Sequence, residues 1–231
     1  MSSRLVDARF ARHVAGYLVD CGAFAVDLGL PRSAWFRWKS GITAPCGCDC
    51  RRLNVFPEQR CLIADALAAA VRDAFPGVDY VVGVAQAGIP WATSLAERLS
   101  LPLAYVRTQP RAAGLRRVEC APRGRGRAVV VEDVVASGAS TRAAIQAIGA
   151  ETELTVAGVQ SIANWDFPEA RTALAGRRVR ALTSYPYLLN HARGAGLIDD
   201  AGLALLTGFY HDPRNYTWDG HFPADEHLPA D

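Results

Sequence analysis

The sequence predicts an α/β protein built on a doubly wound, mostly parallel β-sheet. Two observations lead to this fold class. Short continuous apolar runs alternate along the chain with longer segments of helical periodicity, which is the order of parallel βαβ units. The apolar runs also lack the polar–apolar alternation of half-exposed strands, as expected when helices cover both faces of a sheet. Half of the 231 residues are hydrophobic and 21% are charged, which supplies a sizeable core and excludes disordered, collagen-like and disulfide-miniprotein classes.

The expected elements follow in chain order. Roughly the first 22 residues are expected to form an amphipathic helix, residues 30–55 to be irregular, and residues 57–75 to form a helix that begins at Pro57. We expect strands at 80–84, 103–106, 128–131, 154–159 and 179–182, with helices at 90–99 and 140–148. Two short helices are expected over 185–210, before a loose tail. No repeat or linker divides the chain, so we expect one domain, 1–231, with its α/β core at 57–184.

Charge and motifs disfavour several function classes. The 25 basic and 23 acidic residues leave a formal net charge of +2, which is less basic than is usual for a dedicated DNA-binding protein. The motifs of metalloproteases, α/β-hydrolases, P-loop NTPases and nicotinamide dehydrogenases are not found. No apolar run reaches the ~18 residues that a membrane span needs. The N-terminus carries no hydrophobic signal core, so the six cysteines are expected to be reduced thiols in a cytoplasmic protein.

One segment, residues 128–141, carries most of the chemical information. It reads Ala-Val-Val-Val-Glu-Asp-Val-Val-Ala-Ser-Gly-Ala-Ser-Thr, so that an apolar strand is expected to end in Glu132 and Asp133. A loop of small residues then leads into a helix. Small side chains let backbone N–H groups approach an anion, and the helix N-terminus adds a positive dipole end. Carboxylates at the carboxyl end of a parallel strand lie where ligands bind in open α/β sheets. A phosphate beside two carboxylates suggests a phosphorylated sugar.

This segment resembles the motif with which type I phosphoribosyltransferases bind 5-phosphoribosyl diphosphate (PRPP). The resemblance points to the orotate phosphoribosyltransferase branch, because residues 82–90 are similar to its diphosphate loop and Trp38-Lys-Ser-Gly41 to its N-terminal segment. Residues 44–51 and the tail at 182–213 are also similar to that branch. The resemblance implies a type I phosphoribosyltransferase fold whose small hood is formed by residues 1–56 together with residues 185–231.

The resemblance also implies site roles and partners. Glu132 and Asp133 would hold the ribose hydroxyls, and Mg²⁺ would be held through PRPP rather than by protein ligands. A catalytic role is implied for Arg111, Glu132 and Asp133, and base contacts are implied for Ala136 and Trp165. The other expected PRPP contacts are Lys39, Ala85, Gln86, Ala87, Gly88, Arg107, Ala136, Ser137, Gly138, Ala139, Ser140 and Thr141. A nitrogenous base would be the second substrate, and a homodimer would share the loop at 107–119 across subunits.

Lys39 is the only lysine among the 25 basic residues. Either one lysine survived by chance, or this position needs a compact ammonium rather than a planar guanidinium. Lys39 matches the lysine of the family's Lys-Ser-Gly motif, and this resemblance implies a functional reason for keeping an ammonium at this position.

The pattern departs from the family in the loop and on the base side. The family's loop reads Arg-Lys-x-x-Lys-x-His-Gly, and here Thr108, Arg111 and Ala113 replace its two lysines and its histidine. Seven arginines and one acid lie between Arg107 and Arg127, which also fits a solvated basic loop. Ala136 stands where the family has threonine, and Trp165 where it has the arginine that binds the carboxylate of orotate. The acceptor can therefore be orotate or another heterocycle, and an inactive, PRPP-binding regulator is the alternative.

Cys46, Cys48 and Cys50 alternate along the chain, so an extended strand would direct all three to one face. They form either part of a soft-metal site or, as reduced thiols, part of the packed interior. Structural zinc sites have a different spacing and need a second pair of ligands. His211, His221 and His227 lie in a polar tail and are expected to be solvated.

Overall fold

The structure, a computed structural model, describes residues 4–5, 7–29, 32–38, 40–110, 116–120, 122 and 124–216. Its centre is a seven-stranded sheet in the order β1-β11-β10-β9-β6-β7-β8. All neighbouring strands are parallel except β7 and β8. The strands are β1 (Arg4–Leu5), β6 (Tyr80–Val84), β7 (Leu103–Val106), β8 (Val118–Glu119), β9 (Gly126–Val135), β10 (Leu154–Asn164) and β11 (Val179–Ser184).

The strand order reverses direction once, between β6 and β9. The chain runs outward from β6 to β7, returns to β9 beside β6, and then continues outward through β10 and β11. This is the doubly wound arrangement in which ligands bind beyond the carboxyl ends of the strands at the reversal point. The predicted fold class is therefore confirmed, and the topology directs attention to the ends of β6 and β9.

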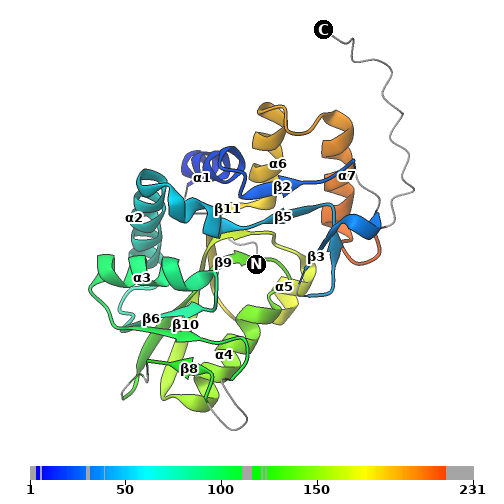
Figure 1. The fold of residues 1–231 in the computed structure, drawn as a ribbon. Helices are drawn as coiled ribbons and strands as arrows, with labels where there is room; N and C mark the ends of the chain where they lie inside the picture. Colours follow the sequence, from blue (N-terminus) through cyan, green and yellow to red (C-terminus); the bar gives the residue numbers. More distant parts are fainter. Residues whose placement is uncertain are drawn as a thin grey trace, which may run out of the picture.

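Helices cover both faces of the sheet, as the continuous apolar runs predict. Figure 1 shows α2 (Pro57–Ala74) and α3 (Gly88–Leu99) on one side of β6 and β10, and α4 (Ala139–Glu151) on the other. Successive strand residues enter different clusters: Val81 packs with α2 and α3, and Val82 packs with α4. Because every side chain of such a strand meets a helix, an alternating pattern is not needed.

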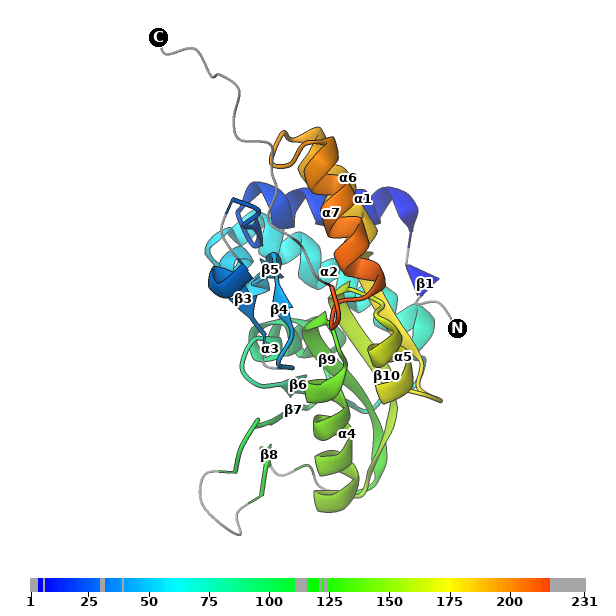
Figure 2. The same ribbon diagram turned by 90° about the vertical axis from the view of Figure 1, so that its right-hand side faces the viewer.

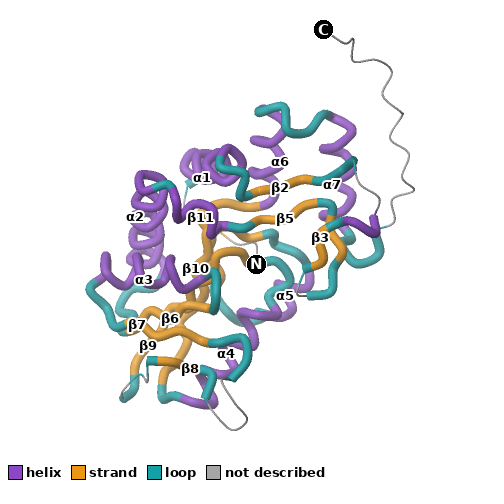
Figure 3. Tube along the Cα trace, in the orientation of Figure 1, coloured by secondary structure: helices purple, strands orange, loops and turns teal. Residues whose placement is uncertain are grey.

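The segments before α2 and after β11 form the hood, defined here as residues 7–56 and 185–216 where described. Figures 1 and 3 show its elements together at one end of the molecule. Two short antiparallel ribbons, β2 with β5 and β3 with β4, lie beside three helices. The hood elements are α1 (Ala8–Asp20), β2 (Phe24–Val26), η1 (Arg32–Ala34), β3 (Phe36–Arg37), β4 (Thr43–Ala44), β5 (Cys46–Cys48), η2 (Cys50–Val55), α6 (Tyr185–Gly194) and α7 (Asp200–His211).

Local capping explains where two hood helices begin. The Asp7 carboxylate accepts the N–H of Arg9 at 2.8 Å, so α1 begins at Ala8 and Leu5 lies in β1 instead of in the expected helix. Asp199 caps α7 in the same way by accepting the N–H of Gly202 at 2.7 Å. Such caps satisfy N–H groups that a helix leaves unpaired at its start.

Figure 2 shows α5 (Pro168–Ala173) beside β10, and the β7–β8 hairpin at the far edge of the sheet. No helix within the described ranges combines the length and apolar character that crossing a lipid bilayer requires.

Candidate functional site

A cavity of about 860 Å³ lies at the carboxyl ends of β6 and β9, beneath the hood. We call its two sides the core wall and the hood wall. The core wall is formed within residues 85–88 and 132–141, and the hood wall within residues 36–52. The predicted residues that line the cavity are Ala85, Gln86, Ala87, Glu132, Asp133, Ala136, Ser137, Gly138, Ala139, Ser140 and Trp165. Three sequence segments that were singled out separately therefore meet at one cavity.

Glu132 and Asp133 lie within β9 and not at its end, contrary to the expectation from sequence. The strand continues to Val135 because its backbone pairs with β10, with Glu132 opposite Ser161. The Glu132 side chain is only 6% exposed. Its carboxylate accepts hydrogen bonds from the Ser140 hydroxyl at 3.3 Å and from the Thr141 hydroxyl at 3.2 Å. The hydroxyls of Ser140 and Thr141 are thus directed to Glu132 in this structure.

Burial shifts the ionisation of both carboxyl groups. It raises the pKa of Glu132 well above its usual range, and the neighbouring charge of Asp133 raises it further. Burial also raises the pKa of Asp133, and the backbone N–H groups of Val134 and Asp133 partly oppose this shift. Two adjacent carboxylates in a low dielectric resist ionising together. A ligand that donates hydroxyl hydrogen bonds, or that brings a cation, would stabilise their charged forms.

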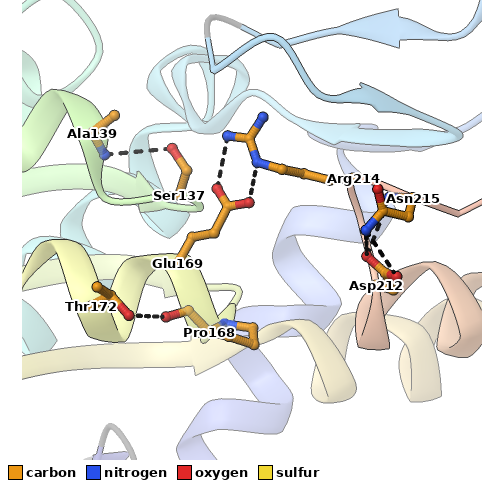
Figure 4. A network of polar contacts seen from close by, with 8 residues as sticks. All are labelled: Ser137, Ala139, Pro168, Glu169, Thr172, Asp212, Arg214 and Asn215. Carbon is orange, nitrogen blue, oxygen red and sulfur yellow. Dashed lines mark hydrogen bonds and ion pairs between the residues drawn. The ribbon is translucent and has the colours of Figure 1, made fainter.

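The small-residue loop turns tightly into α4. Gly138 has a φ of +73°, in the left-handed region that glycine adopts without strain. A Cβ at this position would lie 3.2 Å from the Cα of Ala170, so the loop packs directly on α5. Ala139 begins α4, and its N–H donates to the Ser137 hydroxyl at 3.4 Å (Figure 4). The unpaired N–H groups of the first turn form a site suited to an anion.

The turn between β6 and α3 forms the other part of the core wall. Its residues Ala85 to Ala87 line the cavity, and the peptide bond between Ala85 and Gln86 is cis. Gly88 begins α3 and is buried. A Cβ on Gly88 would lie 2.6 Å from the carbonyl oxygen of Val131, closer than side-chain carbons approach backbone. Glycine therefore allows this turn to lie against β9, next to the acidic pair.

The hood wall contains charged residues that are not among the predicted site residues. Arg37, Arg51 and Arg52 line the cavity together with Asp49. Asp49 holds Arg51 through two hydrogen bonds of 2.6 and 2.8 Å, which lowers the pKa of the Asp49 carboxyl. Asp49 raises the pKa of the Arg51 guanidinium, and the negative charge of Asp133 across the cavity raises it further. Residues 44–51 resemble the family's motif Ser-Pro-x-Tyr-x-Asp-x-Arg, in which Asp49 and Arg51 match the acid and the arginine, so that resemblance already contained the signal.

Trp165 lies at the boundary between the cavity and an aromatic cluster. Its side chain is 1% exposed and stacks on Tyr185, with ring centroids 4.5 Å apart and planes 25° apart. Trp38 meets it edge-on at 4.7 Å. The indole N–H of Trp165 has no hydrogen-bond partner among the described residues. A packing role for Trp165 is evident, and its contact with a base stays a prediction.

Besides Gly88, which is buried at the start of α3, four predicted residues do not line the cavity or lie outside the described residues. Thr141 is fully buried behind Glu132. Arg107 pairs with Glu119 at 3.8 Å and is not among the residues lining this cavity, although its neighbour Thr108 is. Lys39 and Arg111 both fall outside the described residues, so their roles stay predictions.

The loop that follows β7 is anchored where its described residues resume. The Glu151 carboxylate, at the end of α4, accepts the N–H groups of Arg117 and Val118 at 2.8 and 2.9 Å. Arg117 in turn donates to the carbonyl oxygen of Arg107 at 2.9 Å. The hairpin base is therefore held to α4, which carries the small-residue loop at its other end.

The extended strand on which a single face for the three alternating cysteines depends is found only at Cys46 and Cys48. Strand β5 includes Cys46 and Cys48 but ends there, because Asp49 accepts the N–H of Arg51 at 3.1 Å and turns the chain into η2. The sulfur atoms of Cys48 and Cys50 are 3.8 Å apart, while Cys46 contacts the Tyr185 hydroxyl at 3.4 Å. Burial raises the pKa of Cys46 to about 12, which disfavours a metal-binding thiolate. The described residues contain no cluster of three or more His, Cys, Asp or Glu side chains able to hold a metal.

Comparison with known proteins gives a consistent result. The family model of the phosphoribosyl transferase domain matches residues 57–155. The chain is 36% identical to the orotate phosphoribosyltransferase of Bacillus caldolyticus over 206 residues, which cover 88% of this chain and 97% of that protein. It is 35% identical over 209 residues to an orotate phosphoribosyltransferase of Streptococcus pneumoniae, covering 89% of this chain and 97% of that protein.

Solved structures agree at the level of the fold. The orotate phosphoribosyltransferase of Aeropyrum pernix superimposes with a TM-score of 0.67 at 26% identity, covering 80% of this chain and 99% of that one. An adenine phosphoribosyltransferase of Trypanosoma brucei superimposes with a TM-score of 0.60 over 80% of this chain and 84% of that one. At 16% identity the second likeness shows the fold alone.

Proposed function

Because the chain belongs to the orotate phosphoribosyltransferase family, we propose that it transfers the 5-phosphoribosyl group of PRPP to a ring nitrogen of a base. Diphosphate is the leaving group. Orotate is the first acceptor to test, since it is the acceptor named for relatives at 33–36% identity. The observation that carries the proposal is the position of Glu132 and Asp133. They line one cavity with the small-residue loop, at the point where the strand order reverses.

Each part of the core wall suits one part of PRPP. The acidic pair accepts hydrogen bonds from the ribose hydroxyls, and its negative charge favours the positive charge that develops on the sugar as the bond to diphosphate breaks. The backbone N–H groups of residues 137–140 bind the 5-phosphate. The turn at 85–88 presents its backbone to the diphosphate. A ribose with its two phosphate ends thus spans the core wall.

The residues present fit a Mg²⁺ ion that is bound mainly through the substrate. Mg²⁺ sites commonly use one or two carboxylates together with phosphate oxygens, and the cavity offers the adjacent carboxylates of Glu132 and Asp133. When bound, Mg²⁺ neutralises charge on the departing diphosphate. The protein's part is to supply the acidic pair and to orient the ribose against it.

The hood wall supplies positive charge for an anionic acceptor. Trp165 stands where the family has the arginine that binds the orotate carboxylate, and a buried carboxylate without a cationic partner is costly. Arg37 and Arg52 line the same cavity, and neither forms an ion pair with another described residue. One of them is proposed to bind the carboxylate in place of the missing arginine. Ala136 and Trp165 are proposed to contact the base ring.

A homodimer is proposed, in which the loop at 107–119 closes over the partner's cavity and Arg111 neutralises diphosphate. The exposed apolar side chains of Val55, Phe56 and Leu62 offer a surface for the second copy. The altered loop, with Thr108 and Arg111 in place of lysines, also favours a second candidate function. In that alternative the chain binds PRPP as a regulator and does not turn it over.

The chain is proposed to act in the cytoplasm as a single domain covering residues 1–231. The six cysteines are free thiols, the form they keep in a reducing compartment. The hood and the α/β core share one apolar cluster that includes Phe24, Leu67 and Phe209.

A diphosphate-release assay with PRPP, Mg²⁺ and a panel of bases tests the proposal. Orotate, other pyrimidines, adenine, guanine and nicotinate are added one at a time, with binding of PRPP followed in parallel by calorimetry. Steady release with orotate supports the proposed acceptor, and release only with another base reassigns it. Binding of PRPP without release across the panel supports the regulator. Absence of both PRPP binding and release overturns the proposed function.

A further inference from the structure

A second cavity, of about 470 Å³, adjoins the first at the small-residue loop. The two cavities share the lining residues Ser40, Ser137 and Ala139. The remaining walls come from α4, α5 and the segment after α7, and consist of Arg142, Pro168, Glu169, Thr172, Ala173 and Arg214. The place where the proposed 5-phosphate is bound thus opens toward a pocket that carries side-chain charges.

Two arginines and one acid line this second cavity. Figure 4 shows the guanidinium of Arg214 reaching from the segment after α7 toward Glu169 on α5. Its Nε and Nη2 donate to the two oxygens of the Glu169 carboxylate, the Nη2 bond measuring 3.0 Å. Nη1 makes no hydrogen bond with a described residue, and Arg142 makes no ion pair within the described part of the chain. The wall therefore carries a net positive charge.

The position of Arg214 is tied to the position of the small-residue loop. Gly138 packs against Ala170, the residue after Glu169, so that α5 and the loop are held together. On the other side, the Asp212 carboxylate accepts the N–H of Asn215 at 3.2 Å, which fixes the turn that carries Arg214 (Figure 4). A guanidinium held by a carboxylate loses little freedom when it binds an anion.

We propose that Arg142 and Arg214 form a cationic wall for the 5-phosphate of PRPP, with Glu169 as the positioning residue for Arg214. This inference rests on the proposed function and adds charge to the backbone amides of the loop. The phosphate carries up to two negative charges, whereas amides contribute only dipoles. A guanidinium beside the loop supplies the opposite charge and a planar set of donors.

Binding of two different ligands distinguishes the contribution of this pocket from that of the rest of the site. Ribose 5-phosphate carries the 5-phosphate, and diphosphate with Mg²⁺ carries only the leaving group. Calorimetry is performed with each ligand on wild type and on Arg214→Ala. We expect ribose 5-phosphate to bind about five- to tenfold more weakly to the variant, with diphosphate affinity unchanged. Retained diphosphate binding also shows that the variant is folded.

Two further variants test alternative explanations. Glu169→Gln combined with Arg214→Ala removes the acid that the single variant leaves unpaired. If the double variant still binds ribose 5-phosphate weakly, the result supports direct binding by Arg214. If its affinity returns to the wild-type value, Arg214 only neutralises Glu169, and the proposal is overturned. Arg171→Ala breaks an ion pair of 3.1 Å with Asp166 at the same helix and serves as the matched control, with both affinities expected to be unchanged.

Two other results would overturn the cationic wall, and a third would overturn the proposed function as well. Unchanged ribose 5-phosphate affinity in Arg214→Ala, or an equal loss for both ligands, overturns the cationic wall while leaving the proposed function intact. A wild-type protein that binds neither ligand overturns the proposed function and this inference together.

Discussion

The core wall and the hood wall of the cavity differ in charge and in how they are held. The core wall carries the acidic pair Glu132 and Asp133, set in a strand that pairs on both sides. The hood wall carries three arginines and Asp49, set on short ribbons and on η2. A sugar that becomes positive during transfer suits the first wall, and an anionic acceptor suits the second.

The difference suggests how the two substrates are recognised. The shape of the core wall depends on backbone geometry, since Gly88 lets its turn lie against β9 and Gly138 lets its loop lie against α5. Its one departure from the family's pattern named above is Ala136. The hood wall depends on side chains, and Gly47 stands where the family's motif has tyrosine. We therefore expect PRPP binding to be typical of the family, and acceptor choice to depend on the hood.

The largest expected effect is on the core wall. Asp133→Asn replaces the carboxylate proposed to accept hydrogen bonds from the ribose by a neutral amide. This change should weaken PRPP binding by about 1.5–3 kcal/mol. Calorimetry in the presence of Mg²⁺ measures the loss. Asp65→Asn, at an exposed carboxylate paired with Arg98, is the control and should bind as wild type does. Equal affinities for the two variants would remove Asp133 from the ribose site.

The next largest expected effect is on stability, where Gly88 lies against the backbone of β9. Gly88→Ala places a Cβ against the carbonyl oxygen of Val131 and should lower the free energy of unfolding by about 1–3 kcal/mol. Gly149→Ala, in α4, meets no atom within 4 Å and should be neutral or stabilising by up to about 1 kcal/mol. Urea unfolding of both variants measures the contrast. Equal stabilities would show that the turn does not need a glycine.

The loop that approaches the cavity provides a kinetic test. Arg111→Ala should lower kcat about tenfold and change PRPP affinity less, if the guanidinium acts on the leaving diphosphate. Arg125→Ala, at a side chain 90% exposed and 3.8 Å from Glu153, serves as the control. Steady-state kinetics together with calorimetry separates the two effects. Losses of equal size in turnover and affinity would indicate ordinary ground-state binding.

The buried acid of the core wall should cost stability in the free protein. A carboxyl whose pKa is raised on folding destabilises the folded state once the pH exceeds the pKa of the unfolded chain. Glu132→Gln should therefore raise the free energy of unfolding by about 1 kcal/mol at pH 8, and by less at pH 5. Urea unfolding at both pH values measures this, with exposed Glu97→Gln as control. A variant that is less stable at pH 8 would contradict the account.

The smallest expected effect tests the hood. Lys39→Arg keeps the charge but replaces a compact ammonium by a planar group, and should lower kcat/KM about threefold to tenfold. The reverse exchange at the exposed Arg9, Arg9→Lys, should change nothing. A fully active Lys39→Arg enzyme would mean that the single lysine has no special role.

The fold was largely predictable, and the errors have physical causes. Strands β6 and β7 have the predicted bounds because apolar residues fill them completely. Strands β9 and β10 extend beyond their predicted ends, since backbone ladder bonds continue past polar residues such as Glu132 and Ser161. Ribbons of two or three residues in the hood have too few positions to show a period, so residues 30–55 were expected to be irregular.

The core wall was predictable from two local motifs, residues 82–90 and 128–141, whereas in the hood wall only Asp49 and Arg51 match a family motif and their place at the cavity was not predicted. Arg37, Arg51 and Arg52 reach the cavity only because β2 pairs with β5, and β3 with β4, over the strand ends. Arg214 is 74 residues from Ser140 in sequence, and joins the loop only through α5. Such placements follow from tertiary packing, which no local pattern encodes.

The most direct test of the central claim is a crystal structure of the protein with PRPP and Mg²⁺. The account predicts ribose hydroxyls within hydrogen-bond distance of Glu132 and Asp133, and the 5-phosphate against the backbone of residues 137–140. Density for PRPP elsewhere, or a ribose that does not touch either carboxylate, would contradict it.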